Sequence, residues 1–469
     1  MSGRWLLQGC DLVATFDDEG RELAAADVLV DEDLIVEIGA GLDREGCDRV
    51  IDGAGLVVLP GLINAHQHLY QGATRAITSL ERALIGPWLA GLGATFKDWW
   101  RRGLFEPEHV EAIAAAVLTE SLLGGVTTVA DQHYFHPAGP TRPYVEATII
   151  AARAIGVRLH ACRGTLTLGP DAEVVQTVDE VVRHCAALIA EYHDPAPGAM
   201  TRIALAPCGV HVDELEVFDE FAALAADHEH VRLHTHLYEK VDADAAQQRY
   251  GRTPWELLVA HGWAQPRTWL AHVVDPPAPE IAEIADAGVS VAHLIAPDLR
   301  MGWGLAPLRA YLDAGVVVGF GTTGSASNDG ADLLGDLRIA ALAHRSTDPD
   351  NPARWPTARE LLRMATRGSA ACLGREDVGV LAPGRRADLA AWDLRRVDRI
   401  GVHDPLVGLV LTGLSSQAAF VAVDGEILVE HEITTTLDVD AIAARARAAV
   451  PSLEIDAAPT AAARGTEGG

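Results

Sequence analysis

The chain has 469 residues, 49% of them hydrophobic, so it can bury a large core and is long enough for a barrel enzyme with a smaller second domain. Its 37 basic and 66 acidic residues give a net charge of −29, which repels nucleic acids and anionic lipids. With no N-terminal signal sequence and no apolar run of about 20 residues, the sequence predicts a cytoplasmic protein without nucleic-acid or membrane partners.

Short runs that alternate apolar and polar residues near both ends of the chain predict β-strands. The run at 27–31 shows this alternation, and a similar run returns at 420–429. We therefore predict one small β-sandwich domain that is built from residues 1–57 and 380–435. A C-terminal helix and a disordered tail are expected in residues 436–469.

Between these segments, short apolar strands alternate with amphipathic helices such as 106–123 and 178–192. The eight predicted strands start near Val58, Val126, Val157, Arg202, Val231, Thr268, Val289 and Val316. Eight β-then-α units predict an α/β fold in which residues 58–379 form a (β/α)8 TIM-type barrel. Catalytic residues of such barrels lie at the C-terminal ends of the strands, which is where the polar residues of this sequence fall.

Histidines end three of the predicted strands. His66 and His68 follow the first strand and face the same side, because they are two residues apart in an extended chain. His236 ends the fifth strand and His272 ends the sixth. Four neutral imidazoles at strand ends predict one divalent metal ion, with Zn²⁺ as the first choice and Fe²⁺ as the second. If His66 and His68 are taken alone, the alternative to metal binding is that one is a core histidine and the other a surface histidine.

Two further polar residues accompany His236. Glu239 lies three residues beyond it, where a carboxylate can move protons beside a metal-activated water, although a solvated loop glutamate is the alternative. His234 is expected to point away from His236 and to be hydrogen-bonded inside the barrel wall. The other histidines near strands are expected to be structural, with His133 as the main candidate for an exception: His133, His136, His160 and His211.

Together these motifs resemble the amidohydrolase superfamily. The resemblance rests on Pro60-Gly-Leu-Ile-Asn-Ala-His-Gln-His, on His236 with Glu239, on His272, on residues 321–329 and on residues 381–393. It covers nearly the whole chain and implies a metal-dependent hydrolase, with a homodimer as a family-level expectation.

Within the superfamily, the sequence resembles the mononuclear branch that contains purine, pyrimidine and triazine hydrolases. Binuclear relatives bridge two metals with a modified lysine at the end of the fourth strand. The only lysines here are Lys97 and Lys240, and neither lies at that position. This scarcity of lysine supports one metal ion per chain.

Thr323 departs from the deaminases of this branch, which carry an aspartate at the matching position. That aspartate binds the metal and shuttles protons, whereas threonine is a weak neutral ligand. An amine must be protonated before it leaves, while chloride needs no proton and thiomethyl needs less help. The departure favours displacement of chloride, thiomethyl or an amine from an s-triazine or related N-heteroaromatic ring. Residues 121–133 and 293–304 are also similar to the triazine hydrolase subgroup.

We therefore predict Glu239 and Thr323 as catalytic residues. The predicted substrate contacts follow the barrel strands, and they are Trp88, Cys208, His293, Met301, Trp303 and Asn328. An apolar, aromatic wall suits a small, flat, neutral heteroaromatic substrate. Ordinary loop packing would be the alternative for the two tryptophans, a core histidine for His293 and a turn for Asn328.

Two other functions stay open at this stage. The first is a nucleobase deaminase of the guanine or 8-oxopurine type, in which Glu239 or His133 would compensate for Thr323. The second is a binding protein that kept the barrel but lost catalysis. The four predicted metal histidines and Glu239 argue against the second alternative.

Overall fold

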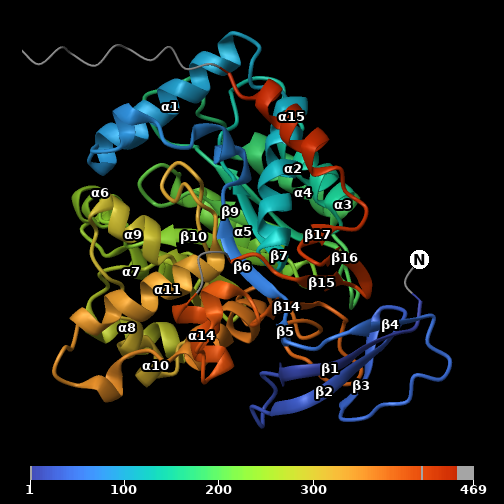
Figure 1. Cartoon of the computed structure of the whole chain (residues 1–469). Coiled ribbons are helices and arrows are strands. Elements are labelled where there is room, and N and C mark those ends of the chain that lie inside the picture. The colour runs from blue at the N-terminus through green and yellow to red at the C-terminus, as the bar shows by residue number, and fades with distance from the viewer. Residues whose placement is uncertain (1–2, 413–415, 452–469) are drawn as a thin grey trace, which may run out of the picture.

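The computed structural model describes residues 3–412 and 416–451, and its centre is a barrel of parallel strands in chain order (Figure 1). The eight barrel strands are β6 (Leu62–Gln67), β7 (Val126–His133), β8 (Arg158–Thr165), β9 (Thr201–Pro207), β10 (Arg232–Leu237), β11 (Thr268–His272), β12 (Ser290–His293) and β13 (Val318–Phe320). Each matches one of the eight predicted strands, which confirms the TIM-type barrel. The barrel closes between β6 and the segment after β13, where the Thr323 amide donates to the His66 carbonyl at 2.9 Å.

Helices surround the barrel, most of them between successive strands and the last three after β13 (Figure 1). They are α1 (Ile85–Arg101), α2 (Pro107–Leu123), α3 (Tyr144–Ile155), α4 (Val178–Tyr192), α5 (Leu215–Ala226), α6 (Val241–Tyr250), α7 (Pro254–Ala260), α8 (Ala278–Asp286), α9 (Ile295–Met301), α10 (Leu308–Ala314), α11 (Leu333–Ala343), α12 (Ala358–Arg363) and α13 (Ser369–Cys372). Helices α4, α7 and α12 each begin with a Thr-x-x-Glu capping box, in which each side chain bonds the other residue's amide. These caps fix where the helices start.

Both ends of the chain build a second, nine-stranded sheet beside the barrel (Figure 1). Its strands are β1 (Trp5–Ala14), β2 (Glu22–Asp31), β3 (Leu34–Gly39), β4 (Arg49–Asp52), β5 (Leu56–Pro60), β14 (Leu389–Asp393), β15 (Phe420–Val423), β16 (Glu426–Glu430) and β17 (Ile433–Thr434). The rings of Trp5 and Phe420 are 5.7 Å apart although two strands separate β1 from β15 in the sheet. Flat strands so placed would be about 14 Å apart, so the sheet folds over its own core, as the two layers of a sandwich do.

The predicted strand near Val58 is divided between the two sheets. Strand β5 pairs with β14 in the small sheet, and β6 starts the barrel only at Leu62. Gly61 lies between them, and a Cβ atom there would come within 2.2 Å of the Thr127 side chain. Only glycine fits where the chain passes this closely from one sheet to the other.

A buried ion pair joins the barrel to the small sheet. The guanidinium of Arg158, at the start of β8, is fully buried and donates to both carboxylate oxygens of Asp388 at 2.7 and 2.8 Å. It also donates to Asp424 at 2.5 Å. Charges this deeply buried are stable only when paired, so the two sheets are fixed to each other at this point.

Two more helices, α14 (Pro405–Leu411) and α15 (Val439–Ala449), lie in the C-terminal part of the chain, and α15 packs against α2. The predicted disordered tail reaches into residues 452–469, which lie outside the described residues. Among the described residues, no helix is long and apolar enough to cross a membrane.

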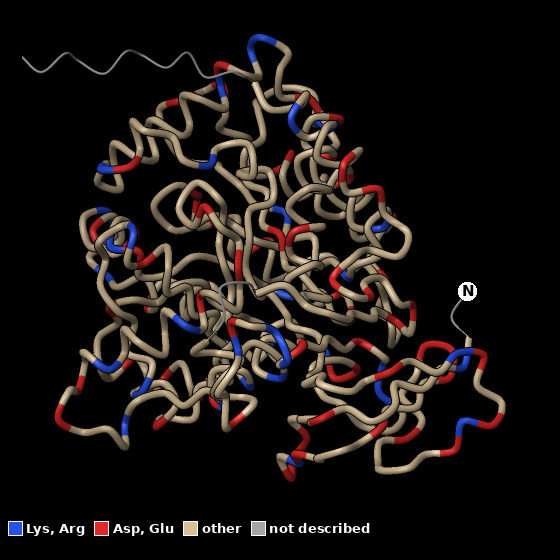
Figure 2. The backbone as a smooth tube through the Cα atoms, in the orientation of Figure 1, with Lys and Arg blue, Asp and Glu red and all other residues tan. Residues whose placement is uncertain are grey.

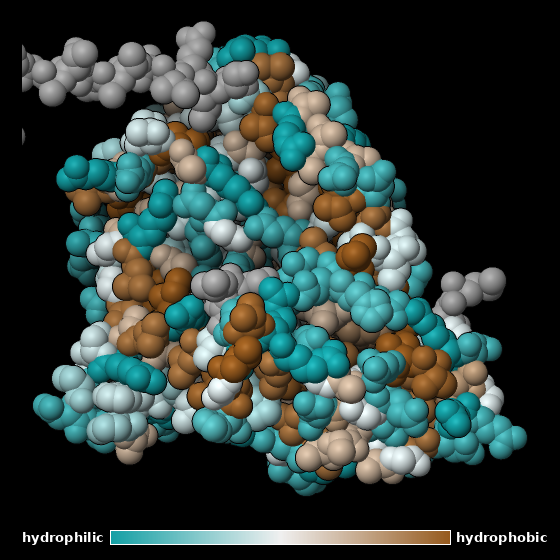
Figure 3. Space-filling model, in the orientation of Figure 1, coloured by the Kyte–Doolittle hydropathy of each residue, from teal (hydrophilic) through white to brown (hydrophobic). Residues whose placement is uncertain are grey.

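The surface reflects the composition of the chain. Acidic residues are spread over the barrel and the small sheet (Figure 2). On the face shown in Figure 3, hydrophobic residues form separate patches among hydrophilic ones.

Candidate active site

Four histidines and one glutamate meet at the C-terminal ends of the barrel strands. The nitrogen atoms of His66, His68 and His236 that could bind a metal ion lie within 4.8 Å of one another. The same limit holds for the candidate ligand atoms of His236, Glu239 and His272. Because His236 belongs to both groups, the five side chains surround one space.

The Nδ1 atom of each histidine is held by a partner on the barrel. His68 Nδ1 donates to the Gln132 carbonyl at 2.7 Å, and His236 Nδ1 donates to the Cys208 carbonyl at 2.6 Å. His272 Nδ1 donates to a carboxylate oxygen of Asp298 at 2.6 Å. Such partners fix the tautomer that leaves the Nε2 lone pair free for a metal ion.

His234 plays the same part for His66. His234 Nδ1 donates to the Trp269 carbonyl at 2.9 Å, so its Nε2 must accept the proton of His66 Nδ1, 2.7 Å away. The expectation of a hydrogen bond inside the barrel is therefore confirmed. The expectation that His234 points away from His236 is wrong, because residues two apart in a strand share a face.

The donor set fits a divalent cation. His66 Nε2 is buried and has no hydrogen-bond partner among the described residues, which is costly unless an ion or water occupies the space in front of it. Burial lowers the pKa of His68 to about 4 and holds the pKa of His66 well below its usual value. Neutral imidazole is the form that binds Zn²⁺ or a similar ion.

Glu239 is the one acidic side chain that lines this space among the described residues. Its Oε1 lies 3.4 Å from His272 Nε2. Burial raises the pKa of Glu239 to about 7, against the opposing charge of His272. Asp242 accepts hydrogen bonds from the amides of Tyr238 and Glu239 at 2.6 and 2.7 Å and so fixes the loop that carries the glutamate.

The backbone is strained at two of these residues. His272 has a φ of 71° and Thr323 has a φ of 56°, in the left-handed region that residues with a branched or bulky side chain rarely adopt. Each such residue costs about 1–3 kcal/mol and persists only where the surroundings enforce it. For Thr323 the enforcing contact is the hydrogen bond that its backbone amide donates to the His66 carbonyl.

The cavity in front of the histidines contains most of the predicted substrate contacts. Trp88 from α1, Cys208 after β9, and Met301 and Trp303 at the end of α9 all line it, together with Thr323. Its volume is about 50 Å³.

The structure does not bring His293 or Asn328 to this cavity. His293 ends β12 with its Nε2 3.0 Å from that of His344, and the Phe320 ring packs against it. Asn328 donates to the Thr322 carbonyl at 3.0 Å and to Asp336 at 2.7 Å, so it supports the segment that carries Thr323. Both side chains hold the barrel wall rather than face the cavity.

Sequence reasoning missed several residues of the site. Gln71, Tyr134 and His211 line the cavity, and Gln71 donates to the Tyr134 hydroxyl at 3.0 Å. Tyr134 follows directly after β7, so its place after a barrel strand was a usable signal. Asp298 lies on α9 and reaches His272 only through the tertiary fold, which no local pattern reveals.

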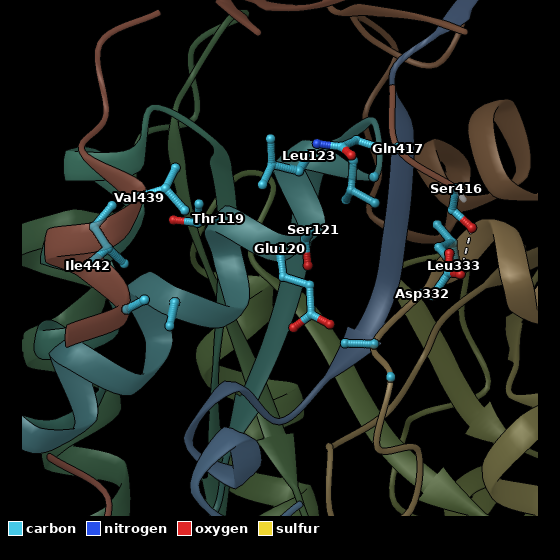
Figure 4. Close-up of a pocket in the computed structure, with 16 residues that line it drawn as sticks. Thr119, Glu120, Ser121, Leu123, Asp332, Leu333, Ser416, Gln417, Val439 and Ile442 are labelled. Atoms are coloured by element: carbon cyan, nitrogen blue, oxygen red, sulfur yellow. Dashed lines mark hydrogen bonds between the residues drawn. The ribbon is translucent and has the colours of Figure 1, made fainter. Parts of the chain in front are cut away.

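A second hollow of about 560 Å³ lies between α2, α15 and residues 330–333 (Figure 4). Its acidic members are Glu120, which is paired with Arg75, and Asp332, which accepts a hydrogen bond from the Ser416 hydroxyl. Neither candidate group of metal ligands in the described part of the chain includes a residue of this hollow. The chemistry therefore belongs to the smaller cavity in front of the histidines.

Comparisons with known proteins agree with this geometry. The model of the Amidohydrolase family matches residues 57–429. The chain is 36% identical to 8-oxoguanine deaminase of Pseudomonas aeruginosa over 97% of this chain and 99% of the relative. It is 33% identical to hydroxydechloroatrazine ethylaminohydrolase of a Pseudomonas species over 90% of each chain. The crystal structure of atrazine chlorohydrolase from Arthrobacter aurescens TC1 complexed with zinc matches with a TM-score of 0.94 and 57% identity, covering 95% of this chain and 100% of that chain.

Proposed function

The chain belongs to the amidohydrolase family, and on that basis we propose that it is a zinc-dependent triazine hydrolase. It replaces a leaving group, chloride, thiomethyl or an amine, on an s-triazine or related N-heteroaromatic ring with a hydroxyl group from water. His66, His68, His236 and His272 hold the zinc ion, and Glu239 and Thr323 act at the reacting atoms.

The observation that carries this proposal is the single carboxylate of the cavity. Thr323 stands where deaminases of the resembled branch carry an aspartate, and Glu239 is the one acidic side chain among the described lining residues. One carboxylate can take one proton from water and pass it to the ring. Chloride then leaves without a second proton, whereas an amine requires one.

Similarity supports the same substrate class. The structure of a variant of atrazine chlorohydrolase complexed with zinc and atraton matches this chain with a TM-score of 0.94 and 56% identity. The relative that acts as hydroxydechloroatrazine ethylaminohydrolase is more distant, at 33% identity. We carry the triazine substrate over from both as part of the proposal.

Zinc held by the four histidines would supply Lewis acidity that lowers the pKa of a water molecule toward about 7. Glu239 Oε1 orients that water, takes a proton from it and donates the proton to a nitrogen of the substrate ring. Its pKa of about 7 suits both steps, since acid and base forms coexist near neutral pH. The incoming hydroxyl group bonds to the ring carbon, and the bond from that carbon to the leaving group breaks.

The aromatic and thioether side chains form a wall for the flat ring. Trp88, Met301 and Trp303 offer faces for stacking and soft sulfur contacts with a neutral heteroaromatic ring. A cavity of about 50 Å³ is far below the roughly 300 Å³ of small-molecule sites. Side chains that line the cavity must therefore rearrange when the substrate binds.

A nucleobase deaminase is the second candidate, because 8-oxoguanine deaminase matches 97% of this chain at 36% identity. In that case Glu239 would have to protonate the departing amine as well as the ring. The two candidates differ in whether chloride or ammonia leaves.

Mass spectrometry of products decides between them. Zinc-loaded enzyme is incubated with a chloro-triazine, a thiomethyl-triazine and 8-oxoguanine in separate reactions. A hydroxytriazine from the first two compounds supports the proposal, and ammonia released only from 8-oxoguanine contradicts it. Glu239→Gln is the control variant, which should keep zinc and lose at least about 100-fold in turnover.

We also propose a cytoplasmic location and a homodimer. The six cysteines are all unpaired, as is common in reducing compartments. Light scattering of the purified enzyme tests the dimer.

A further inference from the structure

A large hollow of about 870 Å³ lies at the N-terminal end of the barrel, opposite the histidine site. Arg232 begins β10 and His236 lies four residues further along the same strand, so the two ends are about 13 Å apart along the backbone. The hollow is lined by six arginines, Arg21, Arg202, Arg232, Arg367, Arg375 and Arg385. Such a gathering of positive charge is unexpected in a chain with a net charge of −29.

Three of these arginines have carboxylate partners. Arg21 pairs with Asp17 and Arg367 pairs with Asp18. Arg375 donates to both oxygens of Asp377 at 2.8 and 2.7 Å. Asp377 also accepts the amide proton of Gly198, so its oxygens are engaged. Two glutamates that line the hollow, Glu19 and Glu376, are exposed.

Arg202 and Arg232 have no ion pair with any described residue. Arg202 is only 3% exposed, and its guanidinium donates to the carbonyls of Gly374, Ala196 and Pro195 at 3.2 to 3.4 Å. Arg232 donates to the Pro266 carbonyl at 3.1 Å. The Nε atoms of both arginines are buried without a hydrogen-bond partner. The Arg232 guanidinium also lies 5.9 Å from the centroid of the Trp269 ring. Both guanidinium groups therefore keep unused N–H donors and have no carboxylate in direct contact.

The two side chains converge on one point. Arg202 Nη1 contacts the Gly374 carbonyl, and Arg232 Nη1 lies 2.8 Å from where a Cβ atom of Gly374 would be. Alternation along the strands places Arg202 on the same face as Ala204, and Ala204 lies in the apolar cluster of the barrel interior. The unpaired charges thus form the lowest layer of the barrel interior, a place usually filled by branched apolar residues.

Neighbouring groups respond to this charge. Burial, together with the charge of Arg375, lowers the pKa of Arg202 to about 10, and burial lowers the pKa of Arg232 to about 10. Burial and then the charges of Arg375, Arg202 and Arg232 hold the pKa of His160 well below its usual value. His160 Nε2 is also buried without a partner. An anion in the hollow would relieve the repulsion and accept hydrogen bonds from the unused guanidinium N–H groups of Arg202 and Arg232.

We propose that this hollow is a binding site for a small oxyanion of the phosphate class, held between the guanidinium groups of Arg202 and Arg232. Guanidinium groups present planar forks of N–H donors, which suit tetrahedral oxyanions with several acceptor oxygens. The site is separate from the catalytic cavity and does not depend on the proposed function.

Binding is tested by thermal unfolding of the zinc-loaded full chain in inorganic phosphate, with ionic strength held constant by sodium chloride. We expect the Tm to rise measurably once phosphate exceeds about 1 mM and to keep rising with the logarithm of its concentration. Arg232→Met should need at least about tenfold more phosphate than the wild type for the same rise in Tm. Gly374→Ala, which crowds Arg232, should do the same without removing a charge. Arg354→Met, at a half-exposed arginine outside the hollow, is the matched control and should respond like the wild type.

The location of the anion is tested by diffraction from crystals soaked in sodium tungstate, since tungsten gives a strong anomalous signal. A tungsten peak between Arg202 and Arg232 supports the proposal. A peak at the histidine site alone, or none, overturns it. Equal phosphate responses in the wild type and in Arg232→Met or Gly374→Ala overturn it as well, because binding at the histidines would survive both substitutions.

Discussion

Replacing His234 should weaken zinc binding although His234 does not contact the proposed ion. In His234→Leu, His66 Nδ1 loses the acceptor that now lies 2.7 Å away. A zinc ion on His66 Nε2 requires the proton to stay on Nδ1, where it would be buried and unpaired. The zinc-free protein avoids this cost, because the proton can move to Nε2 and face the cavity. The loss therefore falls on the zinc-bound state.

The structure sets the size of this effect. One buried donor left without a partner costs about 1–3 kcal/mol, which corresponds to a roughly 5- to 150-fold weaker zinc affinity. Substitutions of partners behind metal ligands lie in a similar range of about 10- to 100-fold. We expect the Kd for zinc to rise within this range.

The assay is a competition titration against a fluorescent zinc chelator, with circular dichroism to check that each variant is folded. His234→Gln is the matched variant, because its side-chain carbonyl can accept the His66 proton, and it should restore most of the affinity. His136→Leu removes another buried histidine, whose Nε2 bonds the His133 carbonyl, and should leave zinc affinity unchanged. A folded His234→Leu variant that binds zinc within twofold of the wild type would refute the argument.

Three other substitutions test the site and the fold. Thr323→Asp adds a second proton carrier to the cavity, so the ratio of ammonia to chloride released should rise; a ratio that stays the same contradicts the leaving-group argument. Arg158→Met leaves the buried Asp388 unpaired and should lower the free energy of unfolding by about 3–5 kcal/mol in urea titrations, whereas the exposed Arg354→Met should cost under about 1 kcal/mol. Burial lowers the pKa of His133 to about 3, so the unfolded chain binds a proton below pH 6.5 that the folded chain does not, and stability falls as the pH falls from 6.5. Between pH 7 and 5 the wild type should therefore lose about 2 kcal/mol more than His133→Phe in urea unfolding, and equal losses would count against this assignment.

The barrel could be predicted because its signal is local. Each strand and its following helix lie within one stretch of sequence, and the eight units recur in order. The division at Gly61 was not visible, because residues 56–67 read as one apolar strand. Only the pairing of β5 with β14, more than 300 residues away, assigns its first half to the other sheet. Partners this distant leave no periodic trace in a single sequence.

The site residues likewise include some that local sequence predicts and others that depend on tertiary packing. Two pairs of site residues could be predicted, because the members of each pair lie within three residues of each other at the end of one strand. These pairs are His66 with His68 and His236 with Glu239. His293 was predicted by analogy of position, but β12 ends there and its ring turns to His344 instead of the cavity. The chain then enters α9, whose Asp298 reaches His272. This contact between a helix and a strand end depends on how the helix packs, so the sequence alone did not reveal it.

Strand β10 carries three polar side chains on the face that points into the barrel. Arg232, His234 and His236 are two residues apart, so all three side chains enter the barrel interior from one strand. A polar column in a packed barrel is stable only if each member finds a partner. His234 has the Trp269 carbonyl and His66, and His236 lies with three other histidines in a geometry that fits a metal ion. Arg232 at the lower end has one backbone carbonyl and the face of the Trp269 ring but no carboxylate, and by the same reasoning it is the member whose partner is an anion from solution.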